Sequence, residues 1–403
     1  MNKSQRNFIF MCCLVYFTSY ITRINYGAAI AEIISANNVA KATAAIAVTG
    51  SFITYGAGQI ISGFLGDKIA PRYLITIGLL ATSLCNITVG FCNNMNIIIP
   101  VWCINGFAQA LLWPPLVRCM TKELPTEQFK SACTLVNAAA SVATIVIYLI
   151  VPVCITLSGW HSVFIVCGIL GSVTCALWTI CTKNKPSCMF TEKDDLKNKP
   201  QDVHTNSVWK IILNTGLIPV MIVIVLQGML RDGITTWMPS YIKDIFNLPS
   251  SYSIITAAIL PVFAILSVSF TQWFSKHNKT ELHTSVWLWG ASFVSCIGLL
   301  ISFESQMFVS ALLMAIITAC MHGINLMLIS NLPAHFVKYG KVSFFSGMLN
   351  SCTYVGSAIS TYGIALLSER FGWNTTITVW GVVAFLGLVL CTYSISKTKK
   401  LMD

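Results

Sequence analysis

The sequence predicts an all-α integral membrane protein in which twelve transmembrane helices form two pseudo-symmetric bundles of six. Composition is the first reason: 55% of the 403 residues are hydrophobic and only 10% are charged, whereas soluble domains carry roughly 25% charged residues. The second reason is a succession of apolar stretches long enough to cross a hydrocarbon core of about 30 Å. The third is a single long hydrophilic segment that divides these stretches six and six.

The six spans of the first half are predicted from runs of predominantly apolar residues, each about 20 residues long or more. Glycine and proline inside several of them are compatible with membrane helices, because neighbouring helices can satisfy the freed backbone groups. In chain order, these predicted spans are 8–34, 42–66, 73–92, 96–119, 131–157 and 161–182.

The hydrophilic segment covers residues 183–210 and separates a predicted N-terminal bundle, 1–182, from a C-terminal one, 211–403. Pro186 and Pro200 disfavour a long helix within it, so we expect a flexible cytoplasmic linker. The same criteria of length and hydropathy place six spans after the linker. These predicted spans are 211–240, 252–275, 284–303, 306–333, 342–367 and 374–396.

Basic residues predict the orientation, because Lys and Arg are retained on the cytoplasmic side of short loops. Most of the 25 Lys and Arg residues fall in segments that a cytoplasmic N-terminus places inside. The outer loops hold only Lys41, Lys243 and Arg370. We therefore expect a multi-pass protein of a bacterial-type inner membrane with both termini in the cytoplasm. The net charge of +11 comes mostly from this bias and does not indicate nucleic-acid binding.

No sequence feature indicates an enzyme or a bound cofactor. The sixteen cysteines are scattered through apolar spans without a CxxC pair, which is typical of small buried residues with free thiols rather than of a metal or redox site. The chain also lacks a P-loop, a GxSxG motif and an HExxH motif. ATP hydrolysis and the common hydrolase chemistries are therefore not indicated.

Two arginines inside apolar spans indicate an anionic ligand. Arg23 lies in the middle of the first span and Arg231 at the equivalent point of the second half. A charge at bilayer depth costs from about 2.5 to more than 10 kcal/mol and usually faces a ligand or water. Guanidinium groups present paired donors that suit phosphate or carboxylate oxygens. The alternative for Arg231 is a structural ion pair with Asp232, although adjacent residues on a helix point in different directions.

The loop after the second span carries a recognisable motif. Residues 63–72 read GFLGDKIAPR, which resembles the G-x-x-x-D-(R/K)-x-x-x-R signature of major facilitator proteins, whose two bundles rock around a midplane site. The resemblance implies that Asp67, Lys68 and Arg72 form a charge relay at a cytoplasmic gate. Ordinary positive-inside decoration is the alternative, and the corresponding segment of the second half, 275–279, keeps only charge.

Further strings, spread through nearly the whole chain, resemble one branch of that superfamily, the organophosphate:inorganic phosphate antiporters. They are YxxxYxxRxN at 16–25, Tyr55-Gly56 before the gate loop, NGFAQALLWPP at 105–115 with Arg118, GWH at 159–161, LRDG at 230–233, WMPSY at 237–241 and FGW at 371–373. The resemblance implies exchange of a sugar phosphate or glycerol phosphate for inorganic phosphate by alternating access. It also implies that Arg23 and Arg231 bind the phosphoryl group from opposite halves.

The sequence departs from that branch where the branch places further basic and polar residues. Ile24 and Gln59 each stand where a lysine is usual, and Gly228 stands where a tyrosine is usual. The fifth span should carry a W-N-x-x-H-N string, but residues 136–141 read VNAAAS, so the histidine is absent. These departures leave open a bulkier organophosphate or a carboxylate as the substrate.

Aromatic and polar side chains of the same spans are predicted to line a substrate pocket. Tyr16 and Tyr20 lie one helical turn apart, and Tyr20 lies about one turn from Arg23, so the three can share one face. His322, midway along the tenth span, is predicted to bind the ligand or carry a proton; a neutral buried histidine is the alternative. The other predicted substrate-binding residues are Asn25, Gln109, Trp113 and Asn137, with Tyr354 as a further candidate. Ordinary helix packing is the alternative for each.

Three functions remain open at this point. The first is an organophosphate antiporter, which Arg231 and the double-proline string favour. The second is a proton-coupled symporter of an organic carboxylate such as a sugar acid, which the missing lysines and His322 favour. The third is a sugar-phosphate sensor, because some members of the resembling branch are membrane receptors. The expected partners are a small anion, inorganic phosphate and membrane lipid, and nothing in the sequence requires more than a monomer.

Overall fold

The computed structural model describes residues 3–66, 69–183, 188, 212, 215–332, 335 and 342–398. These residues are almost entirely helical, and no strand occurs among them, which confirms the predicted all-α fold. Eleven helical segments in this part of the chain are long and apolar enough to cross a membrane. The last segment, Gly347–Lys397, has 51 residues, about twice the length that a single crossing needs.

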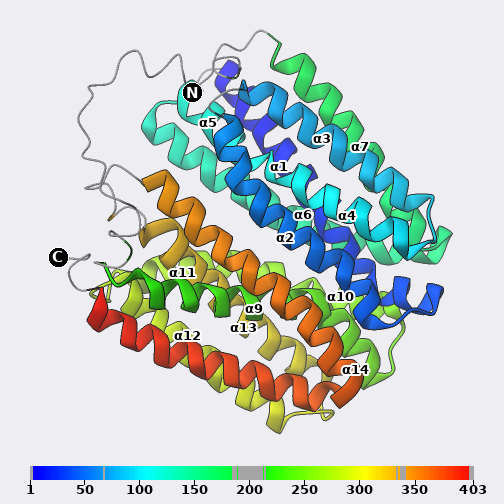
Figure 1. The fold of residues 1–403 in the computed structure, drawn as a ribbon, viewed down its shortest axis with the longest axis vertical. Helices are drawn as coiled ribbons and strands as arrows, with labels where there is room; N and C mark the ends of the chain where they lie inside the picture. Colours follow the sequence, from blue (N-terminus) through cyan, green and yellow to red (C-terminus); the bar gives the residue numbers. More distant parts are fainter. Residues whose placement is uncertain are drawn as a thin grey trace. The chain divides into compact units, whose positions relative to one another are not determined.

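The helices group into two compact units (Figure 1). The helices of the first unit are α1 (Lys3–Asn37), α2 (Lys41–Gly66), α3 (Pro71–Gly90), α4 (Met95–Ala110), α5 (Trp113–Glu123), α6 (Thr126–Ser158), α7 (Trp160–Cys181) and α10 (Ser250–Ala257). Helix α10 follows the linker in the sequence, yet it packs against α6 and α1. The predicted domain boundary had assigned this stretch to the second bundle.

The second unit contains the remaining helices. They are α9 (Leu217–Phe246), α11 (Ile259–Ser275), α12 (Glu281–Ile301), α13 (Met307–Asn325), its π-helical continuation η4 (Leu326–Asn331) and α14 (Val342–Lys397). Helix α14 consists of two helices in succession, because Gly372 leaves helical geometry with a φ of 78°, a conformation that glycine adopts without steric cost. This break falls between predicted spans 342–367 and 374–396, so every predicted span has a helical counterpart.

Two predicted spans are interrupted within the membrane crossing. The span predicted at 96–119 is α4 followed by α5, with a turn at residues 111–112. The double proline that follows Trp113 lies in the first turn of α5, where proline is tolerated because the first N–H groups of a helix have no intrahelical partner. The span predicted at 252–275 is interrupted in the same way between α10 and α11.

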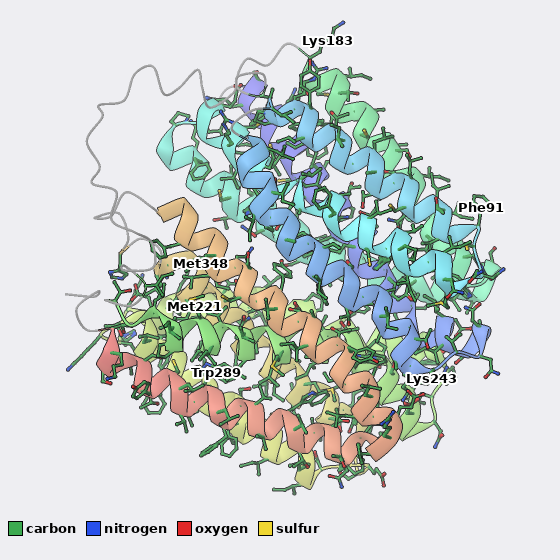
Figure 2. The ribbon with its side chains drawn as sticks, in the orientation of Figure 1. Phe91, Lys183, Met221, Lys243, Trp289 and Met348 are labelled. Atoms are coloured by element: carbon green, nitrogen blue, oxygen red, sulfur yellow. The ribbon has the colours of Figure 1, made fainter. Side chains whose placement is uncertain are left out.

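The outer surface of each unit is apolar along the middle of its helices. Leu84 is 55% exposed, Leu266 61% and Val294 66%. In water, apolar surface of this extent would drive association, whereas the hydrocarbon of a bilayer covers it. Figure 2 shows Phe91 and Lys183 at opposite ends of the first unit, which agrees with the antiparallel pairing of α3 and α7 across the thickness of a membrane.

In the second unit, α9 and α14 approach each other closely at two glycines. A Cβ atom at Gly228 would collide with the carbonyl oxygen of Thr353, and one at Gly356 would collide with that of Val225. Small residues at helix crossings allow backbones to approach in membrane proteins. No side chain fits at position 228 of this structure. This explains why glycine stands here, where tyrosine is usual in the resembling branch.

We expect Gly356→Ala to destabilise the second unit, because an added methyl group would push α14 away from α9 and overpacking of this kind costs about 1–3 kcal/mol. Gly363→Ala in the same helix is the matched control, since nothing lies within 4 Å of its added Cβ. Heating the purified variants and following the folded fraction by size exclusion measures the difference. Equal unfolding temperatures for Gly356→Ala and Gly363→Ala would contradict the close approach of α9 and α14.

Candidate functional site

The first predicted arginine, Arg23, lies on α1 beside two tyrosine rings. Its Cζ atom is 4.5 Å from the ring centroid of Tyr20 and 5.1 Å from that of Tyr55, which belongs to α2. Cation–π contacts of this kind are worth roughly 0.5–2 kcal/mol, and they orient the guanidinium without neutralising its charge. Arg23 is half-buried, so an anion that binds it would exchange water for a charge-assisted contact.

A row of aromatic contacts leads to Arg23 within the first unit. The ring centroids of Tyr20 and Tyr16 are 5.1 Å apart, and those of Tyr16 and Trp113 are 4.5 Å apart. Trp113 is the first residue of α5, so the interruption of the fourth span places this ring against α1. The structure thus brings together four of the predicted site residues. Tyr55 was noted in the sequence only as part of the Tyr55-Gly56 motif, and its contact with Arg23 was not predicted.

Gln109 lies in the interior of the first unit. Its Oε1 accepts a hydrogen bond from Ser19 at 2.5 Å, and its Nε2 donates to Thr22 at 2.9 Å and to Thr82 at 2.8 Å. The side chain is 1% exposed. Because both donors and the carbonyl are engaged, Gln109 ties α4 to α1 and α3.

Asn25 belongs to the same interior network. Its Nδ2 donates to Oδ1 of Asn86 at 2.7 Å. The backbone carbonyl of Thr22, one residue before Arg23, accepts from Nδ2 of Asn86 at 3.0 Å and from Nδ2 of Asn105 at 3.2 Å. Polar groups inside a membrane bundle must find partners within the protein, and here those partners hold the turn of α1 that carries Arg23. We call these side chains the amide network: Ser19, Thr22, Asn25, Thr82, Asn86, Asn105 and Gln109.

Asn137 is exposed on α6, and its Nδ2 donates to the carbonyl oxygen of Cys133 at 2.9 Å. The structure places it on the helix that packs against α1, but its amide is turned back to its own helix. A role in substrate binding stays a prediction for this residue.

The second predicted arginine, Arg231 on α9, forms a two-point ion pair with its neighbour. Its Nε lies 2.7 Å from Oδ1 of Asp232, and its Nη2 lies 2.8 Å from Oδ2. The two side chains are 13% and 17% exposed. The sequence had led us to expect neighbouring residues to point apart; the long arginine side chain instead folds back along the helix to reach the carboxylate.

The carboxylate of Asp232 is also held by α14, and it lies near the predicted histidine. Ser357 donates to Oδ2 of Asp232 at 2.5 Å. His322 on α13 is partly buried and within electrostatic range of both Arg231 and Asp232. The structure therefore gathers a polar cluster from three helices of the second unit. The sequence analysis named Asp232 only as a structural ion-pair partner of Arg231. Its position inside an apolar span, where acidic residues are rare, is the signal that could have identified it as part of the site.

Of the predicted gate residues, Asp67 and Lys68 lie outside the described residues. Arg72 is the second residue of α3 and donates from Nη2 to the carbonyl oxygen of Thr179 at 2.9 Å, while its own carbonyl accepts from Nε1 of Trp178 at 3.3 Å. These bonds fix the start of α3 to the end of α7. The charge relay stays a prediction.

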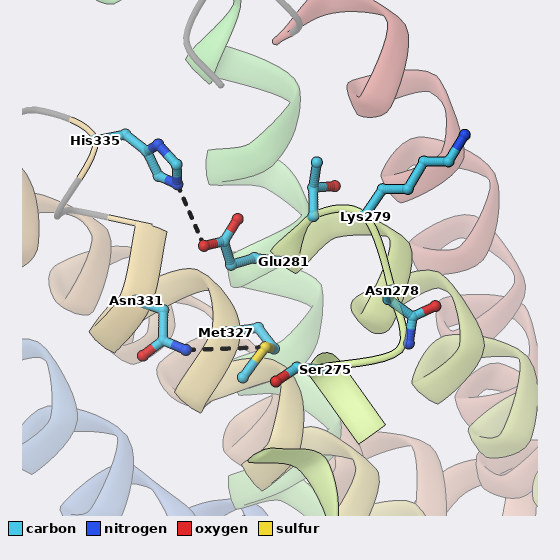
Figure 3. Close-up of a pocket in the computed structure, with 8 residues that line it drawn as sticks. Ser275, Asn278, Lys279, Glu281, Met327, Asn331 and His335 are labelled. Carbon is cyan, nitrogen blue, oxygen red and sulfur yellow. Dashed lines mark hydrogen bonds and ion pairs between the residues drawn. The ribbon is translucent and has the colours of Figure 1, made fainter. Parts of the chain in front are cut away.

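The second unit has a polar pocket between the loop that joins α11 to α12 and the helix η4 (Figure 3). This loop is the counterpart, in the second half, of the motif at 63–72. Its volume is about 240 Å³. Nε2 of His335 lies 3.2 Å from Oε1 of Glu281 across the pocket. The residues that line it are Ser275, Asn278, Lys279, Thr280, Glu281, Met327, Asn331 and His335.

Comparison with known proteins gives a family match and several distant relatives. A model of the Major Facilitator Superfamily matches residues 12–361. A probable hexose phosphate transport protein of Chlamydia trachomatis is 25% identical over 191 residues, which cover 47% of this chain and 42% of that protein. The membrane sensor protein UhpC of Escherichia coli is 27% identical over 169 residues, 42% of this chain and 38% of that protein. The chloroplastic ascorbate transporter of Arabidopsis thaliana is 22% identical and covers 95% of this chain and 73% of that protein.

The matches to the hexose phosphate and sensor relatives span about two fifths of those proteins. Among solved structures, the peptide transporter POT superposes with a TM-score of 0.75 at 12% identity, over 98% of this chain and 94% of that chain. A D-xylose-proton symporter gives a TM-score of 0.73 at 10% identity, over 98% and 99% of the two chains. At such identities these structural likenesses concern the fold.

Proposed function

Because this chain belongs to the Major Facilitator Superfamily, as the motif at 63–72 predicted, we propose that it transports a small phosphorylated organic anion in exchange for inorganic phosphate. Proteins of this superfamily expose a midplane site to each side of the membrane in turn. The relatives and structural neighbours are transporters and a sensor, not enzymes, in agreement with the absence of catalytic motifs from the sequence.

The observation that carries the proposal is the setting of Arg23. A permanently charged side chain lies in a membrane span, half-buried, with its guanidinium against Tyr20 and Tyr55. Charged side chains in such spans are rare because they are expensive, and they usually face a ligand or water. A planar guanidinium suits the paired oxygens of a phosphoryl group, and the similarity to hexose phosphate transport proteins supports that class of anion.

The framework around Arg23 supports a binding role as well. The amide network holds the turn of α1 that carries Arg23 through both Asn86 and Asn105, and the aromatic row restricts the side chain itself. Binding groups that are held in place before the ligand arrives lose less entropy on binding. Gln109 and Asn25, which the sequence predicted as direct ligands, then act by positioning α1.

Exchange rather than one-way transport follows from the cost of moving charge. A guanidinium that has to pass through a closed, dry state carries a desolvation penalty, and a bound anion offsets it. The loaded protein therefore changes conformation readily, whereas the empty protein does so slowly. A second anion on the far side restores the fast path.

Uptake of labelled glucose 6-phosphate into proteoliposomes tests the proposal. We expect vesicles loaded with inorganic phosphate to take up the sugar phosphate at least about tenfold faster than vesicles loaded with buffer, because the latter require the empty protein to reorient. Equal uptake under both loadings would contradict exchange. Saturable binding without uptake under either loading would instead identify a sensor, as the UhpC relative is named.

A second candidate function, proton-coupled symport of an organic anion such as a sugar acid, is favoured by the ion pair of Arg231 and Asp232. A phosphate exchanger needs no acidic residue beside its cation, whereas a carboxylate that can bind a proton suits symport. The ascorbate transporter among the relatives is named for an organic acid. Accumulation driven by an inward pH gradient, without internal phosphate, would favour this second function.

A further inference from the structure

The cluster in the second unit contains a carboxylate that imitates an anionic ligand. Arg231 binds Asp232 through Nε and Nη2, with N–O distances of 2.7 and 2.8 Å. This two-point geometry is the one in which a guanidinium binds a carboxylate or a phosphoryl group. Because Asp232 is the next residue of α9, it is permanently present at the donors that a transported anion would use.

The carboxylate is held from a second helix, which makes its position reproducible. The hydroxyl oxygen of Ser357 on α14 lies 2.5 Å from Oδ2 and 2.9 Å from the carbonyl oxygen of Thr353, so its single O–H is shared between these two acceptors. The close approach of α9 and α14 at Gly228 and Gly356 brings Ser357 within reach.

Among the described residues, the charged or titratable groups that act on Asp232 are few. They are Arg231 on the same helix and His322 on α13; α14 contributes only the hydroxyl of Ser357. The ion pair is largely shielded from water, with side chains 13% and 17% exposed. In such a setting, the loss of one partner strongly affects the charge state of the other.

We propose that Asp232 is a built-in counter-anion of Arg231, which an incoming anionic substrate displaces, and that the displaced carboxylate then binds a proton. The inference rests on the proposed function, transport of a phosphorylated anion, and adds that Arg231 is one of the groups that bind this anion. The substrate anion and the Asp232 carboxylate cannot both bind Nε and Nη2 of Arg231. Their like charges would also repel each other at such close range.

The displaced carboxylate remains in a poorly hydrated place without its cation. Protonation removes that buried charge. The proton comes from water on the side where the anion enters, and one O–H bond forms on the Asp232 carboxyl group. When the anion leaves, the proton returns to water and the carboxylate pairs with Arg231 again. Anion and proton therefore move in the same direction.

A purely structural pair, which only fastens α9 to α14, makes different predictions. It would stay closed when an anion binds, and binding would involve no proton on Asp232. Counting protons therefore separates the two roles, whereas loss of activity in a variant would not.

The test is calorimetric titration of glucose 6-phosphate into the full-length protein in lipid nanodiscs at pH 8, in buffers of different ionisation enthalpy. Comparing the wild type with Asp232→Asn subtracts the protonation of the sugar phosphate itself. We expect the wild type to take up about one proton more per bound anion than the variant. We also expect Asp232→Asn to bind glucose 6-phosphate at least about fivefold more tightly. In this variant no carboxylate occupies the donors of Arg231, so none has to be displaced before the anion binds.

Ser357→Ala provides a second variant in case Asp232→Asn does not fold. Loss of the Ser357 hydroxyl weakens the hold on Asp232, so the sugar phosphate should bind about two- to threefold more tightly. Ser396→Ala, an exposed serine of the same helix, should leave the affinity unchanged.

Three results would overturn the inference. They are equal proton counts for the wild type and Asp232→Asn, weaker binding by a folded Asp232→Asn protein, and unchanged or weaker binding by Ser357→Ala. All three presuppose that the wild type binds glucose 6-phosphate. If it binds neither this probe nor inorganic phosphate, the proposed function itself fails, and the inference fails with it.

Discussion

Replacement of Arg23 by lysine should lower the rate of sugar phosphate uptake by about 10- to 100-fold, the effect of losing one charge-assisted hydrogen bond worth about 1.5–3 kcal/mol. Lysine keeps the positive charge but not the planar, two-point geometry. It also loses the flat contact with the rings of Tyr20 and Tyr55. Because the charge is conserved, the lower uptake rate would be due to the lost geometry of the guanidinium.

The measurement is initial uptake of labelled glucose 6-phosphate into phosphate-loaded proteoliposomes, normalised to the amount of folded protein. Arg370→Lys is the matched control, because Arg370 is exposed and lies in the second half of the chain. It should transport at the wild-type rate. Wild-type rates for Arg23→Lys as well would show that Arg23 does not bind the anion.

Gln109→Leu should have the second largest effect, and it should act on stability and transport together. The substitution removes the acceptor of Ser19 and the donor to Thr22 and Thr82. Each buried polar group left without a partner costs about 1–3 kcal/mol, so we expect a clear fall in the temperature at which the protein unfolds. Uptake per folded molecule should fall too, because α1 no longer holds Arg23 in place.

Gln272→Leu is the matched control, because Gln272 is exposed on α11. Thermal unfolding in detergent, followed by the fluorescence of buried tryptophans, compares the two variants. If Gln109→Leu unfolded at the wild-type temperature but lost glucose 6-phosphate binding, Gln109 would be a direct ligand. The original prediction from the sequence would then hold, and the positioning role would be wrong.

The fold was largely predictable because a membrane imposes simple rules on the chain. Length and hydropathy alone located the helices, since a crossing needs about 20 apolar residues whatever its neighbours are. The interruption at residues 111–112 was missed, although the double proline after Trp113 was visible. Proline is tolerated inside membrane helices often enough that its presence alone does not predict a break. The assignment of α10 to the first unit was also beyond the sequence, because it depends on packing.

The candidate site was predictable in its charges and less so in its geometry. Arg23 and Tyr20 follow from helical spacing on one element, and the structure brings them together. The engagement of Gln109 depends on α1 and α3, which are distant in sequence. The pairing of Arg231 with Asp232 depends on the rotamer of a long side chain, which spacing does not determine. Gly228 is explained only by the carbonyl group that α14 places against it.

The most direct test of the central claim is self-exchange of inorganic phosphate. Labelled phosphate is offered to proteoliposomes that contain either phosphate or buffer, with wild-type protein and with Arg23→Lys. The account predicts uptake that internal phosphate stimulates strongly and that Arg23→Lys lowers to the same extent as it lowers sugar phosphate uptake. Absence of phosphate flux under both loadings, with correctly folded wild-type protein, would contradict phosphate exchange as the activity of this chain.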